Sequence, residues 1–238
     1  MNNSFRYLST IGLFCAGVVG CFGFGDHVET PPGTAEILHQ IEVASHAAND
    51  RDYTETRKYL FRNSRFKKLG EMNVKATHRQ NSAIQLEILA GPAVDDTSGR
   101  VFREVMEGER DLSLAHDADR ALIAANYQVK TLGVEQVRQR ECYVLDITPR
   151  RKSRFLLKGR AWIDKQSFHL VRIEGRPSAS LSIWVGKPLI TQDFDEVSGL
   201  WVKTRSHTAA STFFLGTSEL TIQHGEFTPL TGEMAATK

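Results

Sequence analysis

The sequence lacks the features that several common classes of protein require. Its 238 residues contain only three cysteines, too few for a disulfide framework. Lys and Arg number 30 against 28 Asp and Glu, a net charge of +2, and this balance argues against a dedicated nucleic-acid-binding protein. Outside the N-terminus, no apolar run is long enough to cross a bilayer. At 41% hydrophobic residues, however, the chain is apolar enough to fold.

The common catalytic motifs are also missing. The chain contains no Gly-x-Ser-x-Gly elbow, no Gly-rich phosphate loop and no His-Glu-x-x-His. His116-Asp117-Ala118-Asp119 is the densest group of metal-ligating residues, but its spacing fits no structural zinc site and favours a solvated helix face. Asp193 and Asp195 share a strand face, where a wet surface is favoured over acid–base chemistry. The sequence therefore predicts no enzyme, no metal site and no cofactor.

The N-terminal 25 residues resemble a secretory signal. They contain one charged side chain, Arg6, and are otherwise apolar, small or neutral. Val18-Val19-Gly20-Cys21 resembles a lipobox, which would place a lipid anchor on Cys21. Ordinary cleavage near Gly25 and an uncleaved membrane anchor are the alternatives. Each alternative exports the rest of the chain, so we expect a periplasmic or envelope protein.

The chain after the export segment is predicted to form one domain. Residues 26–33 form a short linker that ends in Pro31-Pro32-Gly33, and Thr34 is suited to cap a helix. Ile37, Leu38, Ile41, Ala44 and Ala48 recur at helical spacing and predict a helix with one apolar face. No later boundary or fixed repeat is visible, so we expect one domain over 34–228 and a C-terminal tail over 229–238. Cys142 is expected to be a buried apolar residue.

From residue 53 the hydrophobic period becomes that of β-strands, interrupted by helical patches at 101–106 and 112–125. Eleven strands are predicted: Tyr53–Arg62, Met72–Arg79, Ala83–Leu89, Tyr127–Gln136, Glu141–Thr148, Phe155–Asp164, Phe168–Glu174, Leu181–Val185, Leu189–Val197, Leu200–His207 and Phe213–His224. Short turns favour sequential antiparallel pairing, and so large a sheet must curl or close. The predicted fold class is mainly β (α+β): a curved antiparallel sheet or half-open barrel with helices covering one face.

One predicted hairpin carries apolar side chains on both faces. A tight loop at Lys165-Gln166 would place Ile163 opposite Phe168, Ala161 opposite Leu170, and Trp162 opposite His169. One face would then hold Phe155, Leu157, Ala161, Ile163, Phe168 and Leu170, and the other Trp162, His169, Val171 and Ile173. Helices, a second sheet or a ligand must cover the second face. The opposite assignment of the two faces also remains open.

A basic run, Arg150-Arg151-Lys152-Ser153-Arg154, lies in a predicted turn between two strands. It could bind anionic lipid headgroups or an acidic partner. A solvated turn that prevents edge pairing is the favoured alternative.

The strand and turn pattern resembles a known family. The matching segments are Gly133–Val137, Cys142–Pro149, Arg160–Asp164, Val171–Gly175, Phe194–Val202 and Ser218–Ile222. They resemble the LolA/LolB/RseB family of periplasmic lipoprotein-binding half-barrels, and more closely the outer-membrane lipoprotein-sorting proteins, over residues 34–228. The resemblance implies about eleven strands, helices on the concave side, and an apolar cavity for the acyl chains of lipoproteins or lipids.

The resemblance also suggests a site and a function. Eight residues are candidates for lining the cavity: Trp162, Val171, Ile173, Trp184, Trp201, Phe213, Leu220 and Ile222. The family has an arginine that closes the cavity, for which Arg57, Arg62 and Arg160 are candidates. We expect a non-enzymatic periplasmic carrier or chaperone. The alternative is an envelope-stress sensor of the RseB type with a membrane-anchored partner.

Overall fold

The structure is a computed structural model. It describes residues 32–48, 52–65, 67–80, 82–93, 96–115, 117–180, 187–212 and 216–230, all of which belong to the unit that begins at Pro32. The predicted export segment with Cys21, the candidate lining residues Trp184 and Phe213, and His116 lie outside the described residues. In the described residues, no helix is long and apolar enough to cross a membrane.

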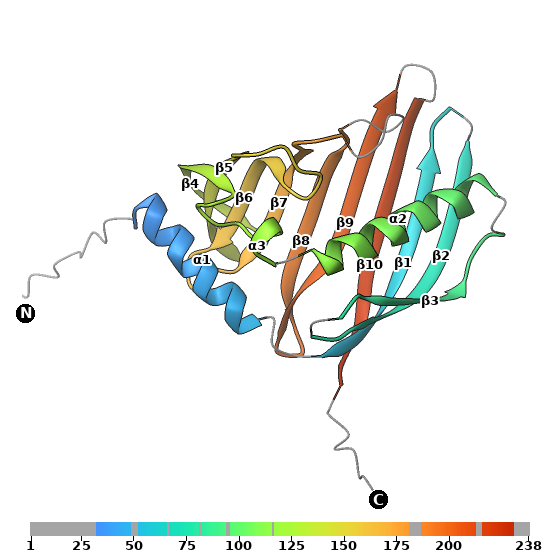
Figure 1. Cartoon of the computed structure of the whole chain (residues 1–238), viewed down its shortest axis with the longest axis horizontal. Helices are drawn as coiled ribbons and strands as arrows, with labels where there is room; N and C mark the ends of the chain where they lie inside the picture. The colour runs from blue at the N-terminus through green and yellow to red at the C-terminus, as the bar shows by residue number, and fades with distance from the viewer. Residues whose placement is uncertain are drawn as a thin grey trace, which may run out of the picture. The chain divides into compact units, whose positions relative to one another are not determined.

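Ten antiparallel strands form one open sheet in the order β3-β2-β1-β10-β9-β8-β7-β6-β5-β4 (Figure 1). The strands are β1 (Tyr53–Asn63), β2 (Lys68–His78), β3 (Gln85–Ala90), β4 (Tyr127–Val137), β5 (Arg140–Pro149), β6 (Leu157–Asp164), β7 (Leu170–Pro177), β8 (Leu189–Val197), β9 (Leu200–Thr212) and β10 (Gly216–Pro229). The mainly β fold is confirmed, but the described residues contain ten strands instead of eleven. The remaining predicted strand, Leu181–Val185, falls outside them.

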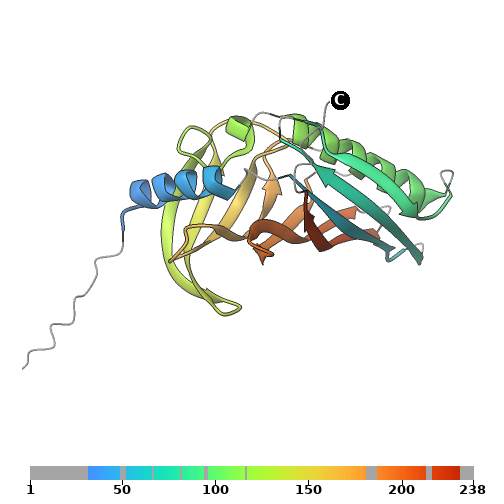
Figure 2. The ribbon, with the colours of Figure 1, turned by 90° about the horizontal axis from the view of Figure 1, so that it is seen from below.

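The strand order determines where the helices lie. β3 and β4 follow each other in the sequence but form the two opposite edges of the sheet, while β10 returns to pair with β1. The connection from β3 to β4 must therefore cross the sheet, and it contains α2 (Thr97–Leu114) and α3 (Asp117–Arg120). Viewed from below, the sheet is curved, and α1 (Thr34–Ala48), α3 and α2 lie on its inner side (Figure 2).

The helices pack against separate ends of this face. Ile37 and Ile41 of α1 are buried in a first core cluster with residues of β4 to β7, including Leu145 and Ile163. Phe102 and Met106 of α2 are buried in a second cluster, whose other buried members are Tyr59, Phe61, Met72, Val74 and Ile222. The helix predicted over 34–48 is confirmed. The prediction that helices cover the concave face is not confirmed.

The helical insert differs from its prediction. The two expected patches, 101–106 and 112–125, are replaced by one helix of 18 residues, α2, and the four-residue α3. Asp96 caps α2 by accepting a hydrogen bond from the backbone N–H of Ser98 at 3.1 Å. The charged segment Glu107–Asp111, which separated the two predicted patches, belongs to this continuous helix: Glu107, Arg110 and Asp111 are exposed, whereas Glu109 faces the sheet.

The β6–β7 hairpin also differs from its prediction. Ile163 pairs with Leu170 instead of Phe168, and Ala161 pairs with Ile173. The Asp164 carboxylate accepts hydrogen bonds from the backbone N–H groups of Gln166 and Ser167, both at 2.8 Å, and this local turn lengthens the loop. A register shift then places Ile173 in the first cluster, on the face opposite Trp162.

Both faces of this part of the sheet are apolar, as the sequence predicted. Along β5, Tyr143, Leu145 and Ile147 belong to the first cluster. Cys142 and Val144 alternate with them and belong to a third cluster on the opposite face, with Val137, Trp162 and Val171. Cys142 is buried, as expected, and burial raises the pKa of its thiol to about 11.

Candidate functional site

A groove of about 420 Å³ lies between α2 and the strands β2 and β3. Its lining residues are Met72, Leu86, Ile88, Pro92, Gly99, Arg103, Met106, Glu107 and Arg110. Three of them, Met72, Leu86 and Met106, also pack in the second cluster. The groove therefore has a mainly apolar lining, and its volume is within the range of small-molecule sites in proteins.

The groove depends on the close approach of α2 to β2. At Gly70 of β2, an added Cβ would overlap the side chain of Ser98, which is buried in the first turn of α2. Glycine thus allows this end of the helix to contact the strand. Farther along, β3 is an edge strand, and Ile88 remains 57% exposed beside the groove. One side of the groove is therefore open to solvent.

Three charged residues of α2 stand at the groove. Arg103, Glu107 and Arg110 are spaced by four and three residues, so they lie on one face of the helix. All three are exposed. Among the described residues, none of the three forms an ion pair with another side chain, whereas Arg57, Arg140 and Arg172 do. The groove thus combines an apolar lining with two arginines that have no carboxylate partner.

A buried ionic network connects α2 to β1. Arg57 donates hydrogen bonds from Nη2 to Glu55 Oε1 at 2.7 Å and from Nη1 to Glu109 Oε2 at 3.0 Å. The Tyr59 hydroxyl donates to the same Glu109 oxygen at 2.6 Å. Burial alone would raise the pKa of Glu109, but the Arg57 guanidinium holds it below its usual value. Glu109 is thus a carboxylate on α2 that two side chains of β1 hold against the sheet.

Two histidines complete the network around Glu55. His78 Nε2 lies 2.7 Å from Glu55 Oε1, and the His78 ring stacks on Tyr53 with centroids 4.3 Å apart. His224 Nδ1 lies 2.8 Å from Glu55 Oε2, while its Nε2 is buried and has no hydrogen-bond partner among the residues that the structure describes. Burial lowers the pKa of His224 to about 4, so the ring is neutral near pH 7. With Glu55 as acceptor, its Nδ1 carries the proton.

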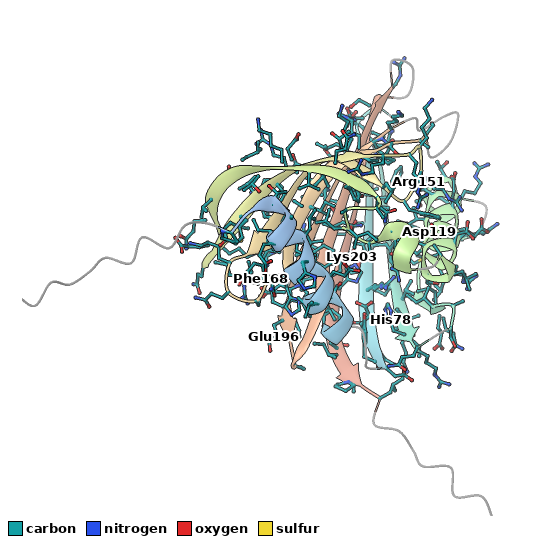
Figure 3. The ribbon with its side chains drawn as sticks, turned by 60° about the vertical axis from the view of Figure 1, so that its left-hand side comes forward. His78, Asp119, Arg151, Phe168, Glu196 and Lys203 are labelled. Carbon is teal, nitrogen blue, oxygen red and sulfur yellow. The ribbon has the colours of Figure 1, made fainter. Side chains whose placement is uncertain are left out.

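Lys203 extends the network toward the centre of the sheet. It projects from β9 (Figure 3), and its Nζ is 4.0 Å from Glu109 Oε1. Burial lowers the pKa of this ammonium, and the nearby cations Arg57 and Arg120 lower it further, while Glu109 and Glu55 oppose the shift. Two carboxylates thus balance Arg57 and Lys203 beneath α2.

The candidate lining residues do not gather in one place. Trp162 and Val171 lie in the third cluster, with Trp201 packed against them, on the face opposite α1. Ile173 belongs to the first cluster. Ile222 belongs to the second cluster, and Leu220 packs against it, beside the residues that line the groove. Both indole N–H groups are engaged, that of Trp162 with Glu135 and that of Trp201 with the Leu170 carbonyl.

The structure separates the three arginines considered for gating. Arg57 is 4% exposed and contacts α2 through Glu109. Arg62 and Arg160 are exposed on their strands. In the part of the chain that the structure describes, Arg57 is therefore the candidate that joins a helix to the sheet.

The basic run 150–154 is largely engaged within the chain. Arg150 donates to the carbonyls of Ala124 and Tyr127 at 2.8 and 3.1 Å. Arg151 pairs with Asp119 at 2.9 Å (Figure 3), and Arg154 pairs with Asp111 at 2.8 Å. These contacts tie the turn to the C-terminal end of α2, to α3 and to the start of β4, which supports a structural role for the run.

The carboxylates considered for chemistry are paired with arginines. Asp193 lies 2.7 Å from Arg172 Nε, and Asp195 lies 3.1 Å from both Arg138 and Arg140. Among the described residues, no group of three metal-ligating side chains is close enough to bind an ion.

Sequence reasoning missed the groove and the network for different reasons. Met72 carried a usable signal, because the alternation of apolar and polar residues that predicted a strand starts there. Arg103, Glu107 and Arg110 would have been placed on one face if 97–114 had been read as a single helix. The network had no local signal, since its members come from β1, β2, β9, β10 and α2.

Comparison with known proteins gives a partial match. Residues 96–175, from the start of α2 through most of β7, match the family model of the MucB/RseB N-terminal domain, which confirms the predicted resemblance for this segment. No curated protein matches the chain.

Solved structures with similar topology share little sequence. One is described as an outer membrane lipoprotein-sorting protein domain from Vibrio parahaemolyticus, with 12% identity and a TM-score of 0.47, covering 84% of this chain and 95% of that one. Another is a DUF1329 family protein from Desulfovibrio piger, with 13% identity and a TM-score of 0.47, covering 83% and 93%. A LolA superfamily protein from Nitrosomonas europaea has 12% identity and a TM-score of 0.44, covering 84% and 95%. The family model, over residues 96–175, shows that this segment of the chain is similar to the MucB/RseB N-terminal domain.

Proposed function

We propose that this protein is a non-catalytic binding protein of the cell envelope that holds acyl chains of lipids or lipoproteins along α2. The observation that carries the proposal is the groove between α2, β2 and β3, with its apolar lining and its side open to solvent. The match of residues 96–175 to the MucB/RseB N-terminal domain and the predicted export segment support an envelope location. The carboxylates of Asp193 and Asp195 are paired with arginines, which favours a binding function over a catalytic one.

The groove is suited to bind an acyl chain reversibly. Each buried methylene contributes roughly 0.8 kcal/mol, so about eight methylenes give about 6 kcal/mol before the entropic cost of ordering the chain. Such a value corresponds to a dissociation constant in the range of tens of micromolar or weaker. A ligand held in this way can be passed on to another protein or membrane, as a carrier requires.

The second cluster provides further apolar surface if α2 moves. Phe102 and Met106 of α2 cover Ile222 of β10, with Leu220 beside it. The contact of Arg57 with Glu109 ties α2 to β1 within the same region. We propose that this contact controls how far α2 separates from the sheet, which assigns the gating role to Arg57. Leu220 and Ile222 would then line the widened site, as the sequence suggested.

The match to a MucB/RseB domain favours a second function. In this alternative, the chain is a regulatory module that uses the same groove to sense acyl chains and reports to a membrane-anchored partner. Ligand binding is common to both functions. They differ in whether the bound protein transfers its ligand to an acceptor membrane or changes its affinity for a partner.

Native mass spectrometry of the protein purified from its own envelope tests acyl-chain binding. A mass excess that is lost on denaturation identifies a bound lipid, whereas an excess that remains on Cys21 identifies a lipid anchor. Ile88→Glu should abolish the reversible excess, because it places a carboxylate in the groove. The matched control is Leu132→Glu on the other edge strand, where Leu132 is 46% exposed and does not line the groove. A protein without any reversible ligand, which also fails to bind added dodecanol, would refute the proposal.

A further inference from the structure

The charged residues of α2 give the groove a chemical preference. Arg103 and Arg110 are seven residues apart, which is about 10 Å along the helix axis and nearly the same direction around it. Both line the groove, both are exposed, and neither has an ion-pair partner among the described residues. A guanidinium without a carboxylate partner beside an apolar surface is suited to an anionic group attached to an apolar chain.

We propose that the groove binds amphiphiles with an anionic headgroup, a carboxylate or a phosphate, which Arg103 and Arg110 hold while the acyl chain contacts Met72, Leu86 and Met106. This inference rests on the proposed acyl-binding function and names its ligand class. The arginines stand on the helix side of the groove and the apolar residues of β2 and β3 on the other. An acyl chain that lies along these strands therefore places its polar headgroup beside α2.

Glu107 allows the proposed preference for a negatively charged headgroup to be tested. It stands between the two arginines on the same face of α2 and lines the same groove. Its carboxylate repels an anionic headgroup and leaves a neutral headgroup unaffected. Removing this charge therefore strengthens the binding of anionic ligands, while removing either arginine weakens it. No purely apolar groove predicts opposite effects from these neighbouring substitutions.

Calorimetric titration of the full chain with three ligands of equal chain length tests the inference. The ligands are dodecanoate, dodecyl phosphate and dodecan-1-ol, each below its aggregation concentration at pH 8 and low salt. We expect one or both anionic ligands to bind about tenfold more tightly than the alcohol. The comparison of dodecanoate with dodecyl phosphate shows which headgroup is preferred. Added salt should reduce the difference from the alcohol, because the arginines are exposed.

Variants of α2 provide the controls. Arg103→Gln and Arg110→Gln should each lower the preference over the alcohol by about three- to fivefold, and Glu107→Gln should raise it by about twofold. Arg100→Gln makes the same charge change on the same helix outside the groove and should leave the preference unchanged. Circular dichroism and urea unfolding establish that each variant folds.

The outcomes separate the two proposals. If the alcohol binds as tightly as both anionic ligands, or if the arginine variants keep the full preference, the headgroup inference is wrong while acyl binding stands. If none of the three ligands binds the wild-type protein, the acyl-binding function is refuted and the inference fails with it.

Discussion

Glu109→Gln tests whether the buried network holds α2 against the sheet. The wild-type carboxylate accepts hydrogen bonds from Arg57 at 3.0 Å and Tyr59 at 2.6 Å, and Lys203 lies 4.0 Å away. Glutamine keeps a carbonyl for the tyrosine but removes the charge. Removing one partner of a buried ion pair typically destabilises a protein by about 3–5 kcal/mol. Here Arg57 keeps Glu55, and Glu109 is 15% exposed, so we expect a loss of about 2–3 kcal/mol.

Urea unfolding measures this loss as a lower midpoint with an unchanged slope. Hydrogen exchange should quicken in α2 and remain unchanged in α1, because the network contains a side chain of α2 and none of α1. The matched control is Glu104→Gln, an exposed residue of the same helix, which should change stability by no more than about 0.5 kcal/mol.

A double-mutant cycle of Arg57→Gln and Glu109→Gln isolates the pair itself. We expect a coupling free energy of at least about 1 kcal/mol, because the two side chains are in direct contact. If Glu109→Gln is no more destabilising than Glu104→Gln, or if the coupling is close to zero, the network does not hold the helix. The proposed gating role of Arg57 would then also be wrong.

Three further results are expected. His224 binds protons less readily in the folded than in the unfolded chain, with a folded pKa of about 4. Its contribution is therefore complete above the unfolded pKa near 6.5 and is lost as the pH falls toward 4. Urea unfolding should show that the free energy of unfolding declines between pH 7 and pH 5. The decline should be smaller in His224→Asn, whereas in the exposed control His39→Asn it should equal that of the wild type. Gly70→Ala should destabilise the protein by about 1–3 kcal/mol in the same assay, since the new Cβ would overlap Ser98, and an unchanged midpoint would contradict that packing. Gly108→Ala should stabilise α2 by up to about 1 kcal/mol because its Cβ would meet no neighbour, and a loss of stability would show that α2 has other contacts there.

The two proposals for this chain depend on different parts of α2. The buried side of the helix carries Phe102, Met106 and Glu109, which join it to the sheet. The exposed side carries Arg103 and Arg110 beside the groove. Variants that alter headgroup preference are therefore expected to leave stability nearly unchanged, whereas Glu109→Gln should alter stability first. This separation allows ligand recognition and helix attachment to be measured independently.

Local periodicity alone was sufficient to predict most of the secondary structure. The apolar spacing from Ile37 to Ala48 predicted α1, and the alternation along β2 predicted a strand, because side-chain direction follows the backbone repeat in both elements. The apolar side chains on both faces of the predicted hairpin around Lys165-Gln166 indicated a sheet with two apolar faces, which the first and third clusters confirm. Periodicity failed at α2, where the charged outer face of one helix resembled a break between two.

The candidate site depended on tertiary structure. A register shift in the β6–β7 pairing, between Trp162 and Ile163, moved Ile173 to the face opposite Trp162, because a shift of one residue reverses a face. Pairing of β1 with β10 brought Arg57 beside His224, which are 167 positions apart in the sequence. The crossing of the β3–β4 connection then placed Glu109 above Arg57 and Arg103 beside Met72.

Patterns of neighbouring residues thus indicated most of the strands, the first helix and the two apolar faces of the sheet, because these properties depend on local side-chain alternation. Which helix contacts which end of the sheet, and which charges are buried or line the groove, followed from long-range packing. Those properties depend on the strand order, in which β3 and β4 form opposite edges, and no local pattern of residues encodes that order.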